Sequence, residues 1–377
     1  MPPSTATPSW RIEAAGAVAD LGVLVPIAVS LIVLNGLSPT AVLLPAGVLY
    51  LIVARVYQLP IAVQPLKAFG AIAIAAGAGP SVIAAGALLM GVTFIVLGAT
   101  GLVDAAARLV PQSVIRGVQL TVAALLAKVA YGLVTATPSS FTHQFDYAAP
   151  LAVLLLVLLW LLRGRISLPI VLLGFIAAAV AGSATNAGYG FGPTAIGVPT
   201  LALQDFMTAA TLLVIPQLPL TFANSCLAPV DAARTYFGDA AKRVTSGRLA
   251  LTLGAANLFA GGISGMPVCH GAGGLSAHVA FGARSWRAPV VIGSSLLVIA
   301  LAFGTTIAQL LPAFPVAILA AMLGVAAITH ALLLRDVRTY DDWAVVVVVA
   351  ILGVFANLAY GVVAGVLLAH ILRRIRR

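Results

Sequence analysis

Charged side chains are scarce in this sequence. Of its 377 residues only 8% are Asp, Glu, Lys or Arg, against about 25% in an ordinary soluble domain, while 62% are hydrophobic. The mean hydropathy is +1.12. A soluble chain of this length needs far more polar side chains to cover its surface, and a disordered chain carries far fewer apolar ones. The composition therefore excludes both classes and predicts a polytopic membrane protein.

Residue types that carry enzyme chemistry are also few. Glu13 is the one glutamate, and the two cysteines, Cys226 and Cys269, cannot form a disulfide framework. The sequence has neither a GxxxxGK[ST] loop for ATP nor an HExxH zinc motif. Its 20 Lys and Arg lie in short clusters between apolar runs rather than on one basic face. We therefore expect no enzyme, no cofactor, no metal and no nucleic-acid partner.

Long apolar runs are what the sequence does have. A spanning helix needs about 20 apolar residues, and fourteen candidate segments follow one another from about residue 24 to about residue 365. Fourteen full spans leave little chain for connections, so some should be short or broken. The segments near residues 70 and 274 are the best candidates, because each opens with Pro and Gly. We expect an all-α polytopic membrane protein with 14 transmembrane segments, of which segments 3 and 10 are broken half-helices.

The positions of Lys and Arg indicate the orientation. With the N-terminus inside, the outside loops at 137–146 and 186–205 carry neither residue, so both termini are expected in the cytoplasm. The loop at 186–205 separates two halves of seven spans, which must have opposite orientations, as in many transporters. We expect a cytoplasmic tail at 1–10, a first inverted repeat at 11–195 and a second at 196–372. A basic tail at 373–377 should contact anionic lipid headgroups.

A first cluster of interest is QLPIAVQPLKAFGAIA at 58–73. Its two prolines favour extended chain before a helix that starts near Leu66. A helix that starts inside the membrane directs free N–H groups and its positive dipole end at the interior, which favours an anion. Lys67 in the first turn adds a full charge, so it faces a polar cavity or a partner. The alternatives are that Lys67 reaches an interface or pairs with Asp20.

A second cluster is GMPVCHGAGGLSAHVAFGARS at 265–285. Pro267 predicts another half-helix with Cys269 and His270 in its first turn, and the glycines allow close backbone approach. The two clusters also show a weak internal similarity, because each has a proline followed two positions later by a polar residue. The segments are Gln64-Pro65-Leu66-Lys67 and Met266-Pro267-Val268-Cys269. The alternatives are helix packing for the glycines and a core position for His270. We expect His278 to be structural.

Two further segments place polar residues inside apolar runs. Asp20, in the first span, is a buried acid that either carries a proton or pairs with a cation such as Lys67. Gln217, Thr221 and Asn224 recur at spacings of four and three, which puts them on one helical face. Such uncharged groups can bind an anion's oxygens, or they can form interhelical hydrogen bonds.

These segments together resemble the molybdate transporter family, which is related to the sulfate permease (SulP) superfamily. The strongest likeness lies in QPLKA (64–68), MPVCHGAGGL (266–275) and FGARS (281–285), with AVADLG and PQLPLT at the helix-one and helix-eight positions. The likeness covers about residues 11–370. It implies a core and a gate domain and oxyanion uptake between the half-helices of spans three and ten. Where transport is coupled, it implies coupling to protons. The family motif positions imply Gln64, Lys67, Cys269, His270 and Gly271 as substrate-binding residues.

The expected function is therefore secondary active transport of a tetrahedral oxyanion, most of all molybdate, by alternating access in a plasma (inner) membrane. Gln217 and Asn224 would add binding groups, and Asp20 would couple protons. Sulfate, a nucleobase-type substrate, an anion channel and an enzyme using Cys269 and His270 are the alternatives. Expected partners are the oxyanion and membrane lipids, with a homodimer left open. Unlike typical sulfate permeases, the chain is expected to carry no STAS domain after its last span.

Overall fold

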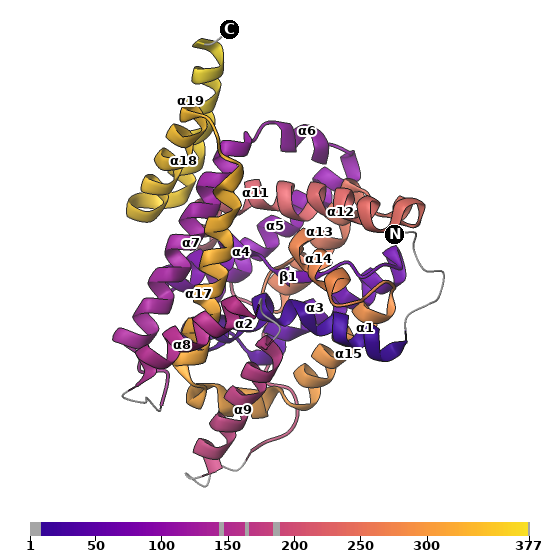
Figure 1. Cartoon of the computed structure of the whole chain (residues 1–377), viewed down its shortest axis with the longest axis vertical. Coiled ribbons are helices and arrows are strands. Elements are labelled where there is room, and N and C mark those ends of the chain that lie inside the picture. Colours follow the sequence, from indigo (N-terminus) through magenta and orange to yellow (C-terminus); the bar gives the residue numbers. More distant parts are fainter. Residues whose placement is uncertain (1–8, 143–146, 163–165, 184–188, 376–377) are drawn as a thin grey trace.

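The computed structural model describes residues 9–142, 147–162, 166–183 and 189–375, apart from a few side chains, and these residues are mostly helical (Figure 1). Two three-residue strands lie among the helices. The first part of the chain forms α1 (Trp10–Ala17), α2 (Leu21–Asn35), α3 (Pro39–Tyr57), β1 (Val63–Pro65), α4 (Lys67–Ala76), α5 (Pro80–Thr100), α6 (Val103–Arg108), α7 (Gln112–Thr135), α8 (Ala148–Leu161) and α9 (Ser167–Ser183).

The second part begins with a long helical stretch that includes two π-helical segments, η2 (Ala210–Val214) and η3 (Thr221–Leu227). Its other elements are α10 (Leu203–Ala209), α11 (Ile215–Leu220), α12 (Ala228–Phe237), α13 (Ser246–Gly262), β2 (Val268–His270), α14 (Ala272–Ala280), α15 (Arg287–Ala302), α16 (Gly304–Leu310), α17 (Val316–Leu332), α18 (Tyr340–Leu352) and α19 (Leu358–Ile375). The π-helical segment η7 (Gly353–Asn357) separates α18 from α19, which pack side by side (Figure 1).

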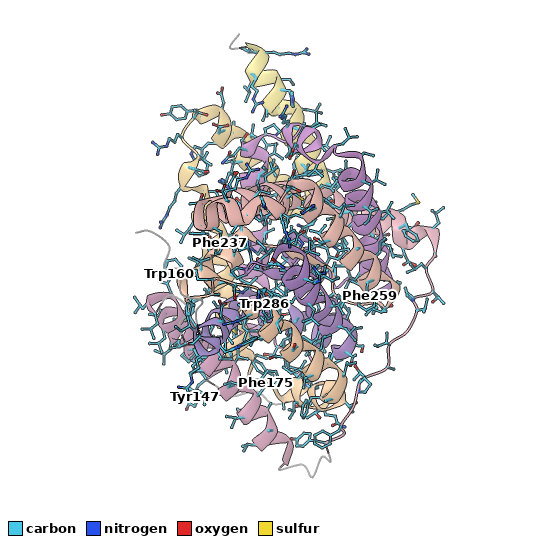
Figure 2. The ribbon with its side chains drawn as sticks, turned by 90° about the vertical axis from the view of Figure 1, so that its right-hand side faces the viewer. Tyr147, Trp160, Phe175, Phe237, Phe259 and Trp286 are labelled. Atoms are coloured by element: carbon cyan, nitrogen blue, oxygen red, sulfur yellow. The ribbon has the colours of Figure 1, made fainter. Side chains whose placement is uncertain are left out.

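Among the described residues, six helical stretches are long and apolar enough to cross a membrane, or up to eight if each of two bent helix pairs is one span. Shorter apolar helices, α4, α8 and α9, lie among them. Large apolar side chains are exposed on the outer faces of the helices, and Figure 2 shows aromatic side chains from several helices among them. Apolar side chains facing outward suit a hydrocarbon environment, so the molecule is a multi-pass membrane protein.

Two closely packed helix pairs form one side of the molecule, α5 with α13 and α3 with α15. Glycines allow the approach. A Cβ atom on Gly254 of α13 would lie 2.7 Å from the backbone nitrogen of Ile95 in α5, and one on Gly293 of α15 would lie 3.0 Å from the carbonyl oxygen of Gly47 in α3. Small residues at these contacts give the dispersion attraction that associates helices in a membrane.

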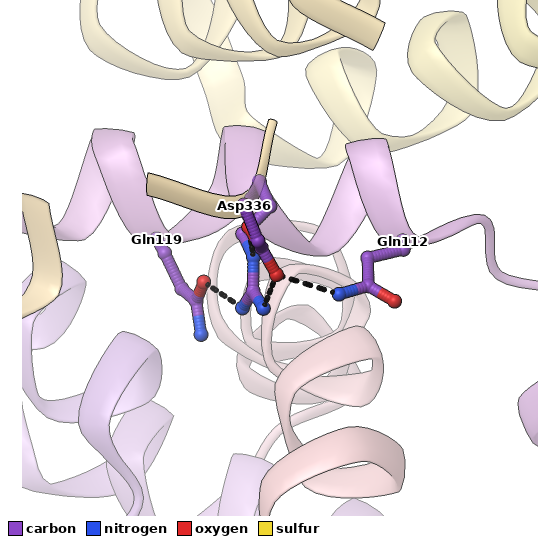
Figure 3. Close-up of polar contacts among 4 residues, drawn as sticks. Gln112, Gln119 and Asp336 are labelled. Atoms are coloured by element: carbon purple, nitrogen blue, oxygen red, sulfur yellow. Dashed lines mark hydrogen bonds and ion pairs between the residues drawn. The ribbon is translucent and has the colours of Figure 1, made fainter. Parts of the chain in front are cut away.

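A second group of helices is built around α7, which packs against α17 and α18. A polar cluster ties one end of α7 to the short turn after α17 (Figure 3). Arg116 forms an ion pair with Asp336, with Nε donating to the carboxylate at 2.8 Å. Gln112 donates to the same carboxylate at 2.9 Å, and Gln119 accepts from Arg116 at 2.8 Å. Arg116 therefore has a structural role in holding α7 against the turn after α17.

The two interrupted segments meet between these groups, where β1 and β2 pair in antiparallel fashion (Figure 1). In the register, Val63 lies opposite His270 and Gln64 lies opposite Cys269. Each strand is followed after one residue by a short helix, α4 or α14. The interruption expected in each segment is therefore present. Backbone groups that do not bond within a helix there are hydrogen-bonded to the opposite strand, which makes such an interruption possible inside a membrane.

The structure corrects two details of the sequence interpretation. Cys269 and His270 lie in β2 and not in the first turn of a helix, because α14 begins only at Ala272. The similarity between the two proline motifs also does not match equivalent positions in the structure. Lys67 is the first residue of α4, so its counterpart by position in the fold is Ala272 and not Cys269. The prolines mislead because Pro65 lies within β1, whereas Pro267 precedes β2.

Candidate functional site

Lys67 occupies the central position of the candidate site. It is the first residue of α4, after the N-cap residue Leu66, and its side chain is half-buried. The start of the helix agrees with the sequence prediction. Lys67 lines two cavities, one of about 10 Å³ and one of about 610 Å³. A cation at the N-terminus of a helix adds its charge to the helix dipole, so this point of the molecule favours an anion.

The smaller cavity brings most of the predicted binding residues together. Its lining comes from α4, the α11 to η3 region and β2, and consists of Lys67, Gln217, Leu220, Asn224, Ser225, Cys269, His270 and Gly271. Six of the seven predicted binding residues are in this set. A volume of about 10 Å³ is close to that of one water-sized probe, so the cavity has no room for a tetrahedral oxyanion in this conformation.

Gln64, the seventh, lies beside the other six. It is 2% exposed and faces Cys269 across the strand pair. Its side-chain amide fills the space that a Cβ atom on Gly271 would need. The absence of a side chain at Gly271 therefore permits the close packing of Gln64 against the start of α14.

Gln217 holds the first turn of α4. Its Oε1 accepts a hydrogen bond from the backbone N–H of Phe69 at 2.9 Å, and its Nε2 donates to Thr221 Oγ1 at 2.9 Å. Gln217 and Thr221 thus share one helical face, as predicted. The backbone N–H of Phe69 is therefore already hydrogen-bonded and does not bind an anion in this conformation. We had expected the N–H groups in the first turn of α4 to be available to an anion, and this one is not. These contacts match the alternative in which Gln217 forms hydrogen bonds between helices.

His270 is anchored by protein groups. It is fully buried, with Nε2 2.8 Å from Thr252 Oγ1 and Nδ1 3.4 Å from the carbonyl oxygen of Ala62. Tyr57 places its ring edge-on to the imidazole and its hydroxyl 2.8 Å from the same Thr252 oxygen. A carbonyl oxygen only accepts, so in the neutral form Nδ1 carries the proton. These partners match the core-histidine alternative.

Cys269 is buried, and its Sγ lies 3.6 Å from the carbonyl oxygen of Pro65. His270 is its neighbour in the strand, and successive side chains of a strand point to opposite faces. The thiol and the imidazole have different partners and are not hydrogen-bonded to each other. A nucleophilic pair needs that hydrogen bond, so this geometry does not favour the enzyme alternative.

The larger cavity was not foreseen from the sequence. Its walls come from α2, α4, α7, α8, α9, α14 and α17 and are mostly apolar. The polar side chains among them include Lys67, Ser167, Thr329 and His330. Lys67 is the one formally charged group among the described side chains of this lining. At about 30 Å³ per water, about 610 Å³ holds roughly twenty waters, which leaves room for a hydrated oxyanion beside Lys67.

The predicted proton carrier, Asp20, closes the turn η1 (Val18–Asp20), but its side chain lies outside the described part of the structure. Its neighbours Ala19 and Gly22 line the larger cavity. His278, expected to be structural, has its Nδ1 3.0 Å from the carbonyl oxygen of Pro60. His330 is the polar residue that the sequence interpretation missed. A histidine within the apolar run at 316–332 was the available signal.

The fold is shared with anion transporters of known structure. Murine solute carrier 26 family member A9, an anion transporter solved in the inward-facing state, superposes with a TM-score of 0.71 at 16% identity, over 100% of this chain and 70% of that one. The transmembrane domain of the cyanobacterial bicarbonate transporter BicA gives 0.64 at 16% identity, over 95% and 97%. At such low identity these likenesses define the fold.

Sequence comparison is more specific. The family described as "Molybdate transporter of MFS superfamily" matches residues 12–126 and 209–330. Molybdate transporter 2 and molybdate transporter 1 of Arabidopsis thaliana are each 28% identical to this chain, over 93% and 96% of it and over 85% and 88% of their own lengths. The chain thus has the fold of these solved transporters, the fold of the SLC26 transmembrane region. This chain belongs to the molybdate transporter family.

Proposed function

We propose that this protein is a secondary active transporter of a tetrahedral oxyanion, with molybdate as the first candidate. The observation that carries the proposal is the position of Lys67, at the N-terminus of α4 and on the wall of a cavity that can hold a hydrated anion. Its relatives in Arabidopsis are named molybdate transporters, and its structural neighbours are named anion and bicarbonate transporters.

The proposed binding residues are those that surround Lys67. Gln64, Asn224, Cys269 and Gly271 lie at the smaller cavity or against it, and Gln217 and His270 hold its walls. Because this cavity is too small for the substrate, we propose that the oxyanion reaches Lys67 from the larger one, and that a movement of the surrounding helices widens the site. Alternating access would consist of that movement.

We further propose a fold of 14 segments in two inverted repeats, at 11–195 and 196–372, between a tail at 1–10 and a basic tail at 373–377. The helix pairing supports it. If two repeats of seven segments are related by a two-fold axis, segment 2 corresponds to segment 9 and segment 4 to segment 11. The contact between segments 4 and 9, which are α5 and α13, then corresponds to the contact between segments 11 and 2, which are α15 and α3. These are two of the closest contacts in the molecule. The same two-fold axis exchanges β1 and β2, which is consistent with their antiparallel pairing.

In this arrangement a core domain contains α4 and α14, and a gate domain contains α7 and α17. Both termini lie in the cytoplasm of a cell whose plasma (inner) membrane holds the protein, with lipids and a second copy of the chain as partners. Trp160, Ser167 and His330 lie at the ends of α8, α9 and α17 that this orientation assigns to the cytoplasmic side, so we propose that the larger cavity is the cytoplasmic vestibule of an inward-facing state.

Import of a dianion against a negative-inside potential costs about 2.3 kcal/mol per charge per 100 mV. Coupled cations must supply that free energy, and we propose protons carried by Asp20. Molybdate-specific transport predicts tight binding of molybdate and tungstate and weak binding of sulfate. Sulfate transport or an anion channel on the same fold are the alternatives, and bicarbonate joins the test because a structural neighbour is named for it.

The test is calorimetric binding of these four anions to the purified protein and to Lys67→Ala and Lys67→Arg. We expect no measurable molybdate binding in Lys67→Ala and partial binding in Lys67→Arg, which keeps the charge. Lys128→Ala, an exposed lysine on α7, is the matched control and should bind normally. Unchanged affinity in a folded Lys67→Ala protein would contradict the assignment of Lys67.

A further inference from the structure

His330 combines two features, a buried polar atom without a hydrogen-bond partner among the described residues and a place on the wall of the larger cavity. It lies on α17, is 7% exposed and lines the larger cavity together with Lys67. Its Nδ1 is fully buried and has no hydrogen-bond partner among the residues that the structure describes. A buried polar atom without a partner is unfavourable, and such atoms in native proteins call for a function or a ligand.

The other buried histidines show what a structural role looks like. His270 and His278 each place Nδ1 near a backbone carbonyl oxygen, those of Ala62 and Pro60, although Nε2 of His278 has no partner among the described residues. Within the described part of the chain, Nδ1 of His330 has no carbonyl oxygen as a hydrogen-bond partner. The hydroxyl of its neighbour Thr329 is also engaged, because it donates to the carbonyl oxygen of Val325 at 2.8 Å. The unpartnered nitrogen, together with a place on the wall of a cavity that can hold an anion, distinguishes His330 from these two histidines.

The surroundings of His330 indicate the chemistry of its partner. Lys67, the charged group among the described side chains of the lining, comes to the same cavity from α4, whereas His330 comes from α17. A ligand between the two must satisfy a cation and a neutral N–H donor together. An oxyanion does so, because it offers several acceptor oxygens on one negatively charged centre.

We infer that His330 is a substrate-contacting residue, which donates a hydrogen bond from its imidazole to an oxygen of the oxyanion bound at Lys67. The anion is then held between α4 and α17. This inference rests on the proposed function and adds to it a contact from the group of helices around α7. Any movement of that group relative to α4 would make or break the contact, so occupancy of the site and the conformation of the transporter would be linked.

Calorimetric titration of the purified protein with sodium molybdate tests the inference. We expect His330→Ala to raise the Kd about tenfold, the usual effect of one lost hydrogen bond to a charged ligand. His330→Gln, whose amide N–H can reach the same region, should recover part of the loss. His370→Ala, which removes an exposed histidine of α19, is the matched control and should leave the Kd unchanged.

A second measurement uses the wild-type protein, so it does not depend on how a variant folds. The chain has five histidines, so their ¹⁵N signals can be resolved in labelled protein and that of His330 identified from the His330→Gln spectrum. Saturating molybdate should shift this signal, and sodium chloride at the same ionic strength should not.

The outcomes separate the two levels of the proposal. Wild-type protein that binds no oxyanion would overturn the proposed function itself. Wild-type protein that binds molybdate through Lys67, with an unmoved His330 signal and a normal Kd in folded His330→Ala, would overturn the role of His330 and leave the transporter proposal intact.

Discussion

The side-chain oxygen of Gln217 lies 2.9 Å from the backbone nitrogen of Phe69, a residue 148 positions away in the chain. The first turn of a helix has N–H groups without acceptors in its own helix. Here α11 supplies one of those acceptors to α4. Gln217 thereby fixes the helix that carries Lys67, and its amide nitrogen is itself fixed by Thr221.

Replacing Gln217 with leucine tests this relationship. Leucine is similar in volume but leaves the buried N–H of Phe69 without an acceptor, which should cost about 1–3 kcal/mol of stability. We expect a lower unfolding temperature in detergent and weaker molybdate binding. Gln204→Leu, on the exposed part of α10, should change neither property. Unaltered stability in Gln217→Leu would mean that water replaces the glutamine oxygen.

Gly271→Ala should affect binding more than stability. Its new Cβ atom would occupy the place of the Gln64 amide, which is the flexible end of a side chain and can move aside. We expect molybdate affinity to fall because Gln64 no longer packs at the start of α14, while the unfolding temperature stays within a few degrees. Gly273→Ala, where a Cβ atom has no heavy atom within 4 Å, provides the comparison. Equal affinity in both variants would argue against a role for Gln64.

Gly254→Ala should destabilise the protein without touching the site. The added methyl group would meet backbone atoms of α5, with Ile95 N at 2.7 Å and Gly91 O at 2.9 Å, and backbone cannot move aside cheaply. Overpacking of this kind costs about 1–3 kcal/mol. Gly262→Ala, in the same helix but with open space around its Cβ, is the matched control. Thermal unfolding of the two purified variants measures the difference, and equal unfolding temperatures would refute the packing argument.

Asp20→Asn addresses the coupling that we propose. The amide cannot carry a proton at neutral pH, so uptake of molybdate into proteoliposomes should no longer respond to an imposed proton gradient. Exchange of internal for external molybdate moves no net charge or proton and should persist. Full gradient-driven accumulation by Asp20→Asn would reject Asp20 as the proton carrier and direct attention to other protonatable groups.

The sequence interpretation was most accurate where the cause is local. Proline restricts the backbone of its own residue and of the one before it. The sequence therefore predicted the interruption at Gln64 and Pro65 and the start of a helix near Lys67. It was wrong about the place of Cys269 and His270, because β2 continues for three residues beyond Pro267 before α14 begins. That extension depends on pairing with β1, which lies about 200 residues earlier in the chain.

His330 was missed for a related reason. A single histidine in an apolar run has no spacing or motif to distinguish it from a core residue, and its meaning depends on which helix faces it. The contact of α17 with the cavity beside Lys67 is set by helix packing, where the apolar residues of many helices are interchangeable in the sequence pattern.

The sequence by itself determined that this chain spans a membrane, where its helices are interrupted and which family it belongs to. Those properties follow from the cost of polar groups in hydrocarbon and from the restricted backbone of proline, which act residue by residue. Only the tertiary structure decided that Gln64 faces Cys269, that Gln217 holds α4 and that His330 shares a cavity with Lys67. Each of these relationships joins residues far apart in the chain, and packing free energy summed over whole helices is what brings them together.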